Sequence, residues 1–91
     1  MAKRVSLAPK LDTAATAALR DDLLNAVNDD LIFDASNVEH LGALTLELLI
    51  SASVIWRKAG KTVTVENISE QMVDDLSRYG LTPDSLQEFA A

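Results

Sequence analysis

The sequence contains no cysteine and few of the residues that break regular structure, with two prolines and three glycines. The absence of cysteine excludes disulfide bonds, thiolate catalysis and cysteine-based metal sites. Hydrophobic residues make up 48% of the chain, which is typical of an ordered globular protein and not of a linker. With 91 residues the chain is too short for a catalytic domain beside a cofactor domain. We therefore expect a single domain over residues 1–91.

Positive charge is also scarce. Eight basic residues stand against 14 acidic residues, which gives a formal net charge of −6. This charge argues against nucleic-acid phosphates or anionic lipid head groups as the main ligand. A neutral or basic protein is the better expected partner, and we predict no nucleic-acid binding.

Long apolar runs are missing as well. No segment approaches the length of about 20 apolar residues that a membrane-spanning helix requires. The N-terminal segment begins Met1-Ala2-Lys3-Arg4 and reaches Asp12 before a secretory-length apolar run can develop. We expect a cytoplasmic protein without membrane insertion.

The spacing of apolar residues predicts alternating strands and helices. Pro9 in the first expected strand indicates either an edge position or the end of the strand. The continuous apolar run of the second is typical of a central strand covered on both faces. This order predicts an α/β fold, with a small, mostly parallel sheet of four or fewer strands and helices packed against it. The expected strands are Val5–Pro9, Leu31–Ala35 and Thr62–Val65, and the expected helices are Thr13–Val27, Leu41–Trp56, Ser69–Gly80 and a short terminal helix from Thr82.

The segment from Leu31 to Ile50 resembles the core of the STAS family, which includes the anti-sigma factor antagonists. In that family a strand ending in Asp-Leu-Ser leads through valine to Asp-Ser-Ser/Thr-Gly-Leu at the start of the next helix. This chain keeps the frame without a gap, as Leu31-Ile-Phe-Asp-Ala-Ser-Asn-Val and then Leu41-Gly-Ala-Leu-Thr. The resemblance covers nearly the whole chain and implies a non-enzymatic regulatory domain that binds another protein.

The chain departs from the family at the position that the antagonists phosphorylate. Ala43 and Leu44 stand where the family carries Ser-Ser/Thr, and neither side chain has a hydroxyl group. Thr45 follows one residue later, in the place of the family's glycine, and one residue near a helix start turns a side chain by about 100°. We expect no phosphorylation at the usual site. Thr45 is the remaining, less favoured candidate for phosphorylation.

The looser sequence Val38-Glu39-His40-Leu41-Gly42-Ala43 is similar to small stand-alone STAS proteins of bacterial chemotaxis operons. That resemblance implies binding to a chemotaxis histidine kinase. Two alternatives stay open. Some STAS proteins are accessory subunits on the cytoplasmic ATPase of a lipid ABC transporter, although they usually keep a hydroxyl where this chain has Leu44. The other alternative is a phosphorylation-switched anti-sigma factor antagonist, which Ala43 and Leu44 disfavour.

The second expected helix carries apolar residues on two opposite sides. One stripe contains Leu46, Leu49, Ile50 and Ser53; the other contains Leu44, Leu48, Ala52 and Ile55. One stripe is enough to cover a sheet, so neighbouring helices, a partner or a second copy of the chain must cover the other. The predicted partner-binding residues are Glu39, His40, Leu41, Gly42, Ala43, Leu44, Thr45 and Leu48, and a homodimer through the same stripe is possible.

No group of residues in the sequence predicts catalysis. His40 is the only histidine and lacks an evident nucleophile or metal beside it, so we interpret it as a residue at a strand end. Asp34, Glu39 and Glu47 are interpreted as solvated charges, since no glycine-rich phosphate loop or metal-ligand spacing accompanies them. Trp56 is interpreted as a packing residue. We expect no enzyme activity, no catalytic residues, no metal and no cofactor.

Overall fold

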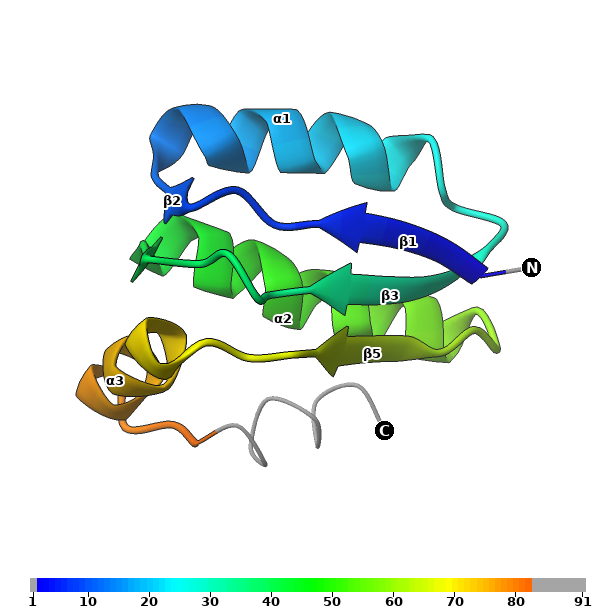
Figure 1. The fold of residues 1–91 in the computed structure, drawn as a ribbon. Helices are drawn as coiled ribbons and strands as arrows, with labels where there is room; N and C mark the ends of the chain where they lie inside the picture. The colour runs from blue at the N-terminus through cyan, green and yellow to red at the C-terminus, as the bar shows by residue number, and fades with distance from the viewer. Residues whose placement is uncertain (1, 83–91) are drawn as a thin grey trace.

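A computed structural model describes residues 2–82 of the 91-residue chain (Figure 1). The strands and helices alternate along most of the chain, in agreement with the predicted α/β class. The strands are β1 (Ala2–Ser6), β2 (Lys10–Leu11), β3 (Asp30–Asp34), β4 (His40–Leu41) and β5 (Val63–Glu66), and the helices are α1 (Thr13–Leu24), α2 (Ala43–Lys58) and α3 (Glu70–Arg78).

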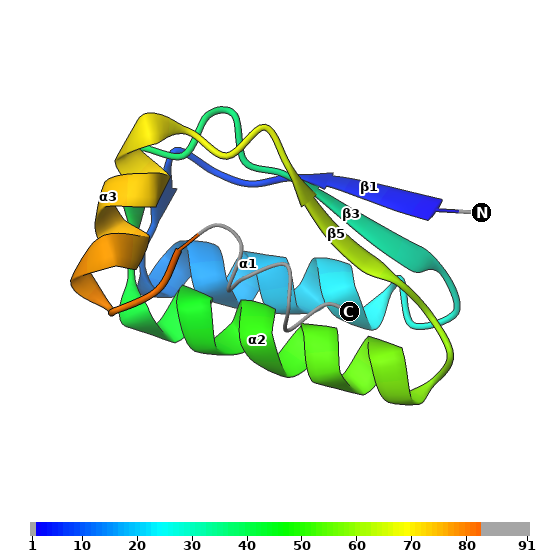
Figure 2. The ribbon, with the colours of Figure 1, turned by 90° about the horizontal axis from the view of Figure 1, so that it is seen from below.

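The main sheet has three parallel strands in the order β1-β3-β5. Phe33 of β3 lies between Val5 of β1 and Val65 of β5 in the register. The helices α1 and α2 lie side by side on one face of this sheet (Figure 2). The small parallel sheet with helices packed against it is confirmed, as are the central place of the 31–35 segment and the edge position of the first strand.

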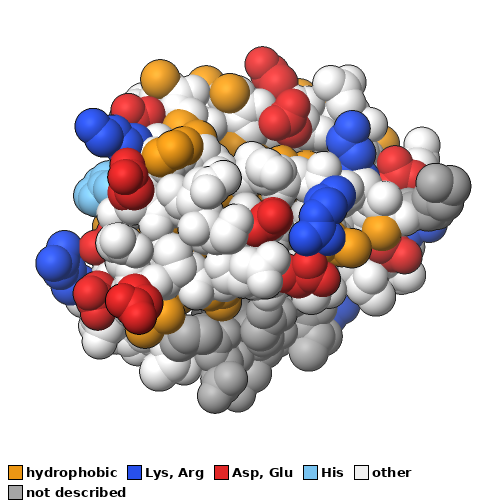
Figure 3. All heavy atoms as spheres, viewed as in Figure 1, with side chains coloured by type: hydrophobic (Ala, Val, Ile, Leu, Met, Phe, Trp, Pro, Cys, Tyr) orange, Lys and Arg blue, Asp and Glu red, His pale blue; other side chains and the backbone are white. Residues whose placement is uncertain are grey.

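The core lies between this sheet and the two helices. Leu31 and Phe33 are completely buried, because alternate residues of β3 point toward the helix layer. The alternate residues Asp30, Ile32 and Asp34 are partly exposed. The prediction that both faces of this strand are covered is therefore wrong for one face. On the other face, acidic and basic side chains are scattered and hydrophobic side chains form no broad patch over the strands (Figure 3).

The helix ends follow their capping residues. Asp12 caps α1 by accepting a hydrogen bond from the Ala15 amide at 3.0 Å, and Ser69 caps α3 in the same way through the Met72 amide. Gly60, which follows the C-cap residue of α2, has a φ of 79°, the left-handed conformation that glycine readily adopts at the end of a helix. Several predicted limits are wrong by a few residues. The first strand covers Ala2–Ser6, not Val5–Pro9, so Pro9 lies beyond its end. α1 ends at Leu24, not at Val27, and α2 begins at Ala43, not at Leu41.

Two short strands were not predicted from the sequence. β2 and β4 are two residues long each and pair in parallel, with Lys10 beside His40 and Leu11 beside Leu41. Leu41 therefore belongs to a strand, which explains the later start of α2. Both strands, together with α3, lie at the end of the molecule toward which the main strands point (Figure 1). The expected helix after Thr82 lies outside the described residues.

The carboxylates at the two ends of β3 hold neighbouring backbone. Asp30 accepts a hydrogen bond from the Thr62 amide at 2.8 Å, which connects the starts of β3 and β5. Asp34 accepts from the Ser36 amide at 3.1 Å and lies 3.7 Å from the Arg4 guanidinium. These hydrogen bonds, from Thr62 and from Ser36, lower the pKa of each carboxyl from its ordinary value of 3.8.

These lowered pKa values predict part of the acid sensitivity of the fold. Each ionised carboxylate contributes stability above the ordinary pKa of 3.8, and this contribution is lost as the pH falls through the lower folded-state pKa. The variant Asp30→Asn/Asp34→Asn cannot titrate at these positions. We expect its urea midpoint to fall less than that of the wild type on acidification through 3.8. Equal losses in both proteins would contradict this assignment.

Candidate functional site

The candidate site is a corner formed where the connections into α1 and α2 meet. The β2–β4 ladder joins these connections, because the amides of Glu39 and His40 both donate to the carbonyl of Pro9, at 2.7 and 3.0 Å. The Gly42 amide then donates to the Leu11 carbonyl at 2.9 Å. Residues that are about 30 positions apart in the sequence thus form one continuous surface. We call this surface, formed by residues 10–13 and 39–44, the corner.

Gly42 allows the closest approach within the corner. A Cβ atom at this position would lie 2.6 Å from the Leu11 carbonyl oxygen, closer than real Cβ contacts come to backbone. Gly42 also forms the N-cap of α2, without a side-chain hydrogen bond. The start of α2 is therefore placed directly against β2.

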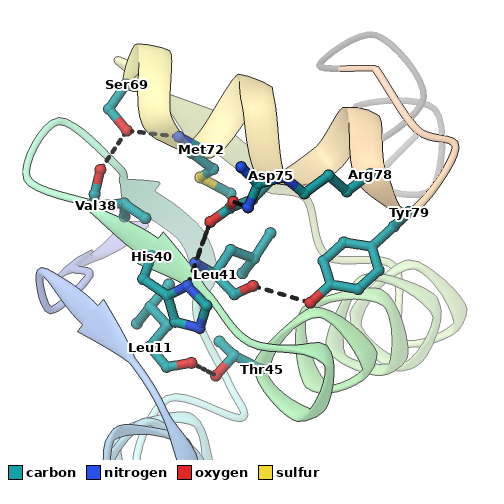
Figure 4. Close-up of polar contacts among 10 residues, drawn as sticks. All are labelled: Leu11, Val38, His40, Leu41, Thr45, Ser69, Met72, Asp75, Arg78 and Tyr79. Carbon is teal, nitrogen blue, oxygen red and sulfur yellow. Dashed lines mark hydrogen bonds and ion pairs between the residues drawn. The ribbon is translucent and has the colours of Figure 1, made fainter.

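The other side of β4 is held by side chains of α3. The backbone groups of Leu41 point away from β2, toward the place where a third strand would lie. Asp75 Oδ2 accepts a hydrogen bond from the Leu41 amide at 2.8 Å, and the Tyr79 hydroxyl donates to the Leu41 carbonyl at 3.1 Å (Figure 4). Two side chains one helical turn apart thus replace the missing strand.

Asp75 is the buried carboxylate of this arrangement. Its side chain is 10% exposed, and Arg78 Nη1 donates to its Oδ1 at 3.0 Å. His40 Nδ1 lies 3.7 Å from Oδ2, on the solvent side (Figure 4). A buried carboxylate requires such donors, because an unpaired charge in the interior is costly. At the first turn of α3 the Ser69 hydroxyl donates to the Val38 carbonyl, which attaches this helix a second time to the segment before β4.

Thr45 is buried beneath the corner, with no exposed surface. Its hydroxyl donates to the Leu11 carbonyl at 3.1 Å and lies 2.6 Å from the Thr16 hydroxyl of α1. The first turns of α1 and α2 are therefore joined by a polar contact inside the protein. The arrangement agrees with the interpretation of Thr45 as a residue of the helix start.

The eight predicted partner-binding residues divide between surface and interior. Seven of them follow one another through β4 and the start of α2, and Leu48 lies one turn further along the helix. Leu41 and Thr45 are buried, so they shape the surface without forming it. Glu39, His40, Ala43 and Leu44 are exposed, and Gly42 and Leu48 are half-buried. The corner also forms a hollow lined by Leu11, Asp12, Thr13, His40, Gly42, Ala43 and Leu44.

Sequence reasoning missed the residues that other elements bring to the corner. Asp12 and Thr13 enter through β2, and Asp75 and Tyr79 through α3. The local pattern around Asp12 is that of a helix cap, and Asp75 follows Asp74 among many acidic residues, so neither pattern indicates a place in the corner. Their roles depend on the β2–β4 pairing, for which strands of two residues give no periodic signal.

The second apolar stripe of α2 is only partly covered. Ala52 is buried and Leu48 half-buried, whereas Leu44 and Ile55 are more than half exposed. Trp56 is buried and its indole Nε1 donates to the Asp29 carbonyl at 2.9 Å, in keeping with its interpretation as a packing residue. Neighbouring helices thus cover part of the stripe, and the remainder faces solvent.

The part of the chain that the structure describes offers neither a metal site nor a membrane-spanning helix. Residues 2–82 contain no group of three His, Asp or Glu side chains placed to hold a metal ion. Within the same range, no helix combines the length and apolarity needed to cross a bilayer.

The chain matches a model of a known protein family. The family model described as "Mlab, STAS domain" matches residues 1–88, nearly the full length of the chain. No curated protein and no solved structure matches significantly.

Removal of the Asp75 carboxylate should destabilise the corner. In Asp75→Ala the buried Leu41 amide loses its acceptor, and an unsatisfied buried donor costs about 1–3 kcal/mol. We expect a loss of unfolding free energy of this size in urea denaturation. The matched control is Asp74→Ala, which removes an exposed carboxylate from the same helix and should change the free energy by less than about 0.5 kcal/mol. Equal effects of the two variants would contradict the role of Asp75.

Proposed function

Because the chain belongs to the STAS domain family, we propose that it is a regulatory protein-interaction module of bacterial signal transduction that binds a chemotaxis-type histidine kinase in the cytoplasm. The corner and the first half of α2 would contact the kinase and so occupy part of its surface. The protein would act through this occupancy and would not catalyse a reaction.

The exposed position of Leu44 on a firmly held backbone carries this proposal. Leu44 is 54% exposed at the first turn of α2, beside Ala43 and next to the hollow of the corner. Gly42 and Leu41 immediately before it are fixed by β2 and α3. An apolar side chain on a preorganised backbone can bind with little loss of conformational entropy, which favours its use as an anchor in a protein interface.

Two features support binding without phosphorylation of the corner. Ala43 and Leu44 are the exposed residues at the start of α2, and neither carries a hydroxyl group. The nearby hydroxyl of Thr45 is fully buried and already bonded to the Leu11 carbonyl. A kinase would have to open the contact between the first turns of α1 and α2 to reach it. We therefore propose that partner binding depends on shape and apolar contact.

The test is capture of partners from a lysate of the organism that encodes the protein, with Leu44→Asp compared with the wild type. A carboxylate at the apolar anchor should weaken binding by at least about tenfold, or about 1.4 kcal/mol. Val27→Asp is the matched control, since Val27 is 51% exposed but lies beyond the opposite end of α1. Circular dichroism checks that each variant folds.

The identity of the captured protein decides between partner classes. A histidine kinase recovered with the wild type and Val27→Asp, but not with Leu44→Asp, would support the proposal. Recovery of a transporter ATPase in the same pattern would assign the corner to the second partner class that the family resemblance implies. Equal capture by all three proteins, or phosphate on Thr45 in the intact mass, would contradict the proposal.

A further inference from the structure

A second apolar surface lies along the outer side of the helix layer, and it shares Leu48 with the predicted partner-binding residues. It forms a groove between α1 and α2, lined by Leu24, Val27, Leu48, Ser51 and Ile55 among others. Leu24, Val27 and Ile55 are 62%, 51% and 59% exposed, so no described element covers them. Figure 2 shows α1 and α2 side by side in the layer opposite the sheet. Contiguous exposed apolar surface of this kind marks an interaction site.

The apolar residues along α2 have a self-complementary order. Leu48 and Ile55 are two helical turns apart on the outward side, and the small Ser51 lies between them. A second α2 placed antiparallel around a two-fold axis near Ser51 brings Leu48 against the second copy's Ile55. The two-fold axis produces this contact twice, because Ile55 of the first copy also lies against Leu48 of the second. The small serine at the centre lets the helices approach closely.

The charges beside this stripe follow the same symmetry. Glu47 and Lys58 are eleven residues apart, so their directions around the helix differ by only about 20°. Both are exposed, and neither makes an ion pair within residues 2–82. In an antiparallel helix pair the two-fold axis brings the same flank of each helix together. Glu47 therefore meets the second copy's Lys58, twice per dimer, in the manner of flanking ion pairs in coiled coils.

We propose that the chain forms a homodimer in which α2 packs antiparallel against α2 of a second copy. Leu48 and Ile55 form the centre of the interface, and two Glu47–Lys58 pairs fix its register. Leu24 and Val27 extend the apolar contact along α1. This inference goes beyond the proposed function and does not rest on it, because its evidence is the symmetry of the groove and not the corner.

The test is sedimentation equilibrium of the purified chain from micromolar to several hundred micromolar concentration. The wild type should change from the 9.8 kDa monomer to twice this mass as the concentration rises. Ile55→Glu places two carboxylates in the apolar centre and should weaken association by at least about tenfold. Circular dichroism confirms folding, which the exposure of Ile55 favours.

Charge reversal provides the sharper control. Glu47→Lys and Lys58→Glu each place like charges opposite each other and should weaken the dimer by about tenfold. The double variant Glu47→Lys/Lys58→Glu restores opposite charges, keeps the net charge of −6, and should associate as the wild type does. A wild type that is monomeric throughout, a dimer that persists in Ile55→Glu, or a double variant no stronger than the single variants would overturn the proposal. None of these measurements involves a kinase, so they leave the proposed function untouched.

Discussion

The backbone of Leu41 is held from both sides, and the position of the candidate site depends on this constraint. Its neighbours His40 and Gly42 donate hydrogen bonds to the carbonyls of Pro9 and Leu11. Its own amide and carbonyl are bound by Asp75 of α3 and by Tyr79 at the C-terminal end of that helix. A strand of two residues has too few backbone hydrogen bonds to hold its place alone. Here one short strand and two side chains supply the partners that a full sheet would give, so β4 and the start of α2 are placed by elements from both ends of the chain.

The same constraint fixes the first turn of α2, which carries Leu44. Because Gly42 lies against the Leu11 carbonyl and Thr45 is bonded beneath it, the first turn of α2 has little freedom to move. Leu44 lies on this turn and is exposed to solvent. Burial of its side chain against a partner would contribute favourable free energy to binding, because apolar surface would be removed from water. The same helix carries Ile55 on its outward side further along, at the groove. A single helix thus covers the core with one side, and with the other it presents an apolar stripe that runs from Leu44 at the corner through Leu48 to Ile55 at the groove.

The sequence predicted the parts of the fold that have strong periodic signals. Some features depend only on residues close together in the sequence, so their patterns indicate the elements directly. They are the apolar run around Phe33, the caps at Asp12 and Ser69, and the turn at Gly60. The segment from Glu39 to Thr45 was predicted as a partner-binding surface, although Leu41 and Thr45 could not be assigned to the interior, because burial depends on the neighbouring elements. Asp75 and Tyr79 could not be found, since contacts across more than 30 residues have no local pattern.

The most direct test of this account is amide hydrogen exchange of Leu41, measured by NMR beside Leu31 in the central strand. The Leu31 amide donates to the Thr62 carbonyl at 2.8 Å and serves as a reference for exchange through global unfolding. If Asp75 and Tyr79 hold the corner as firmly as the main sheet is held, both amides exchange with the same free energy of opening. Exchange of Leu41 through local opening, at a much lower free energy than Leu31, would contradict a preformed binding surface.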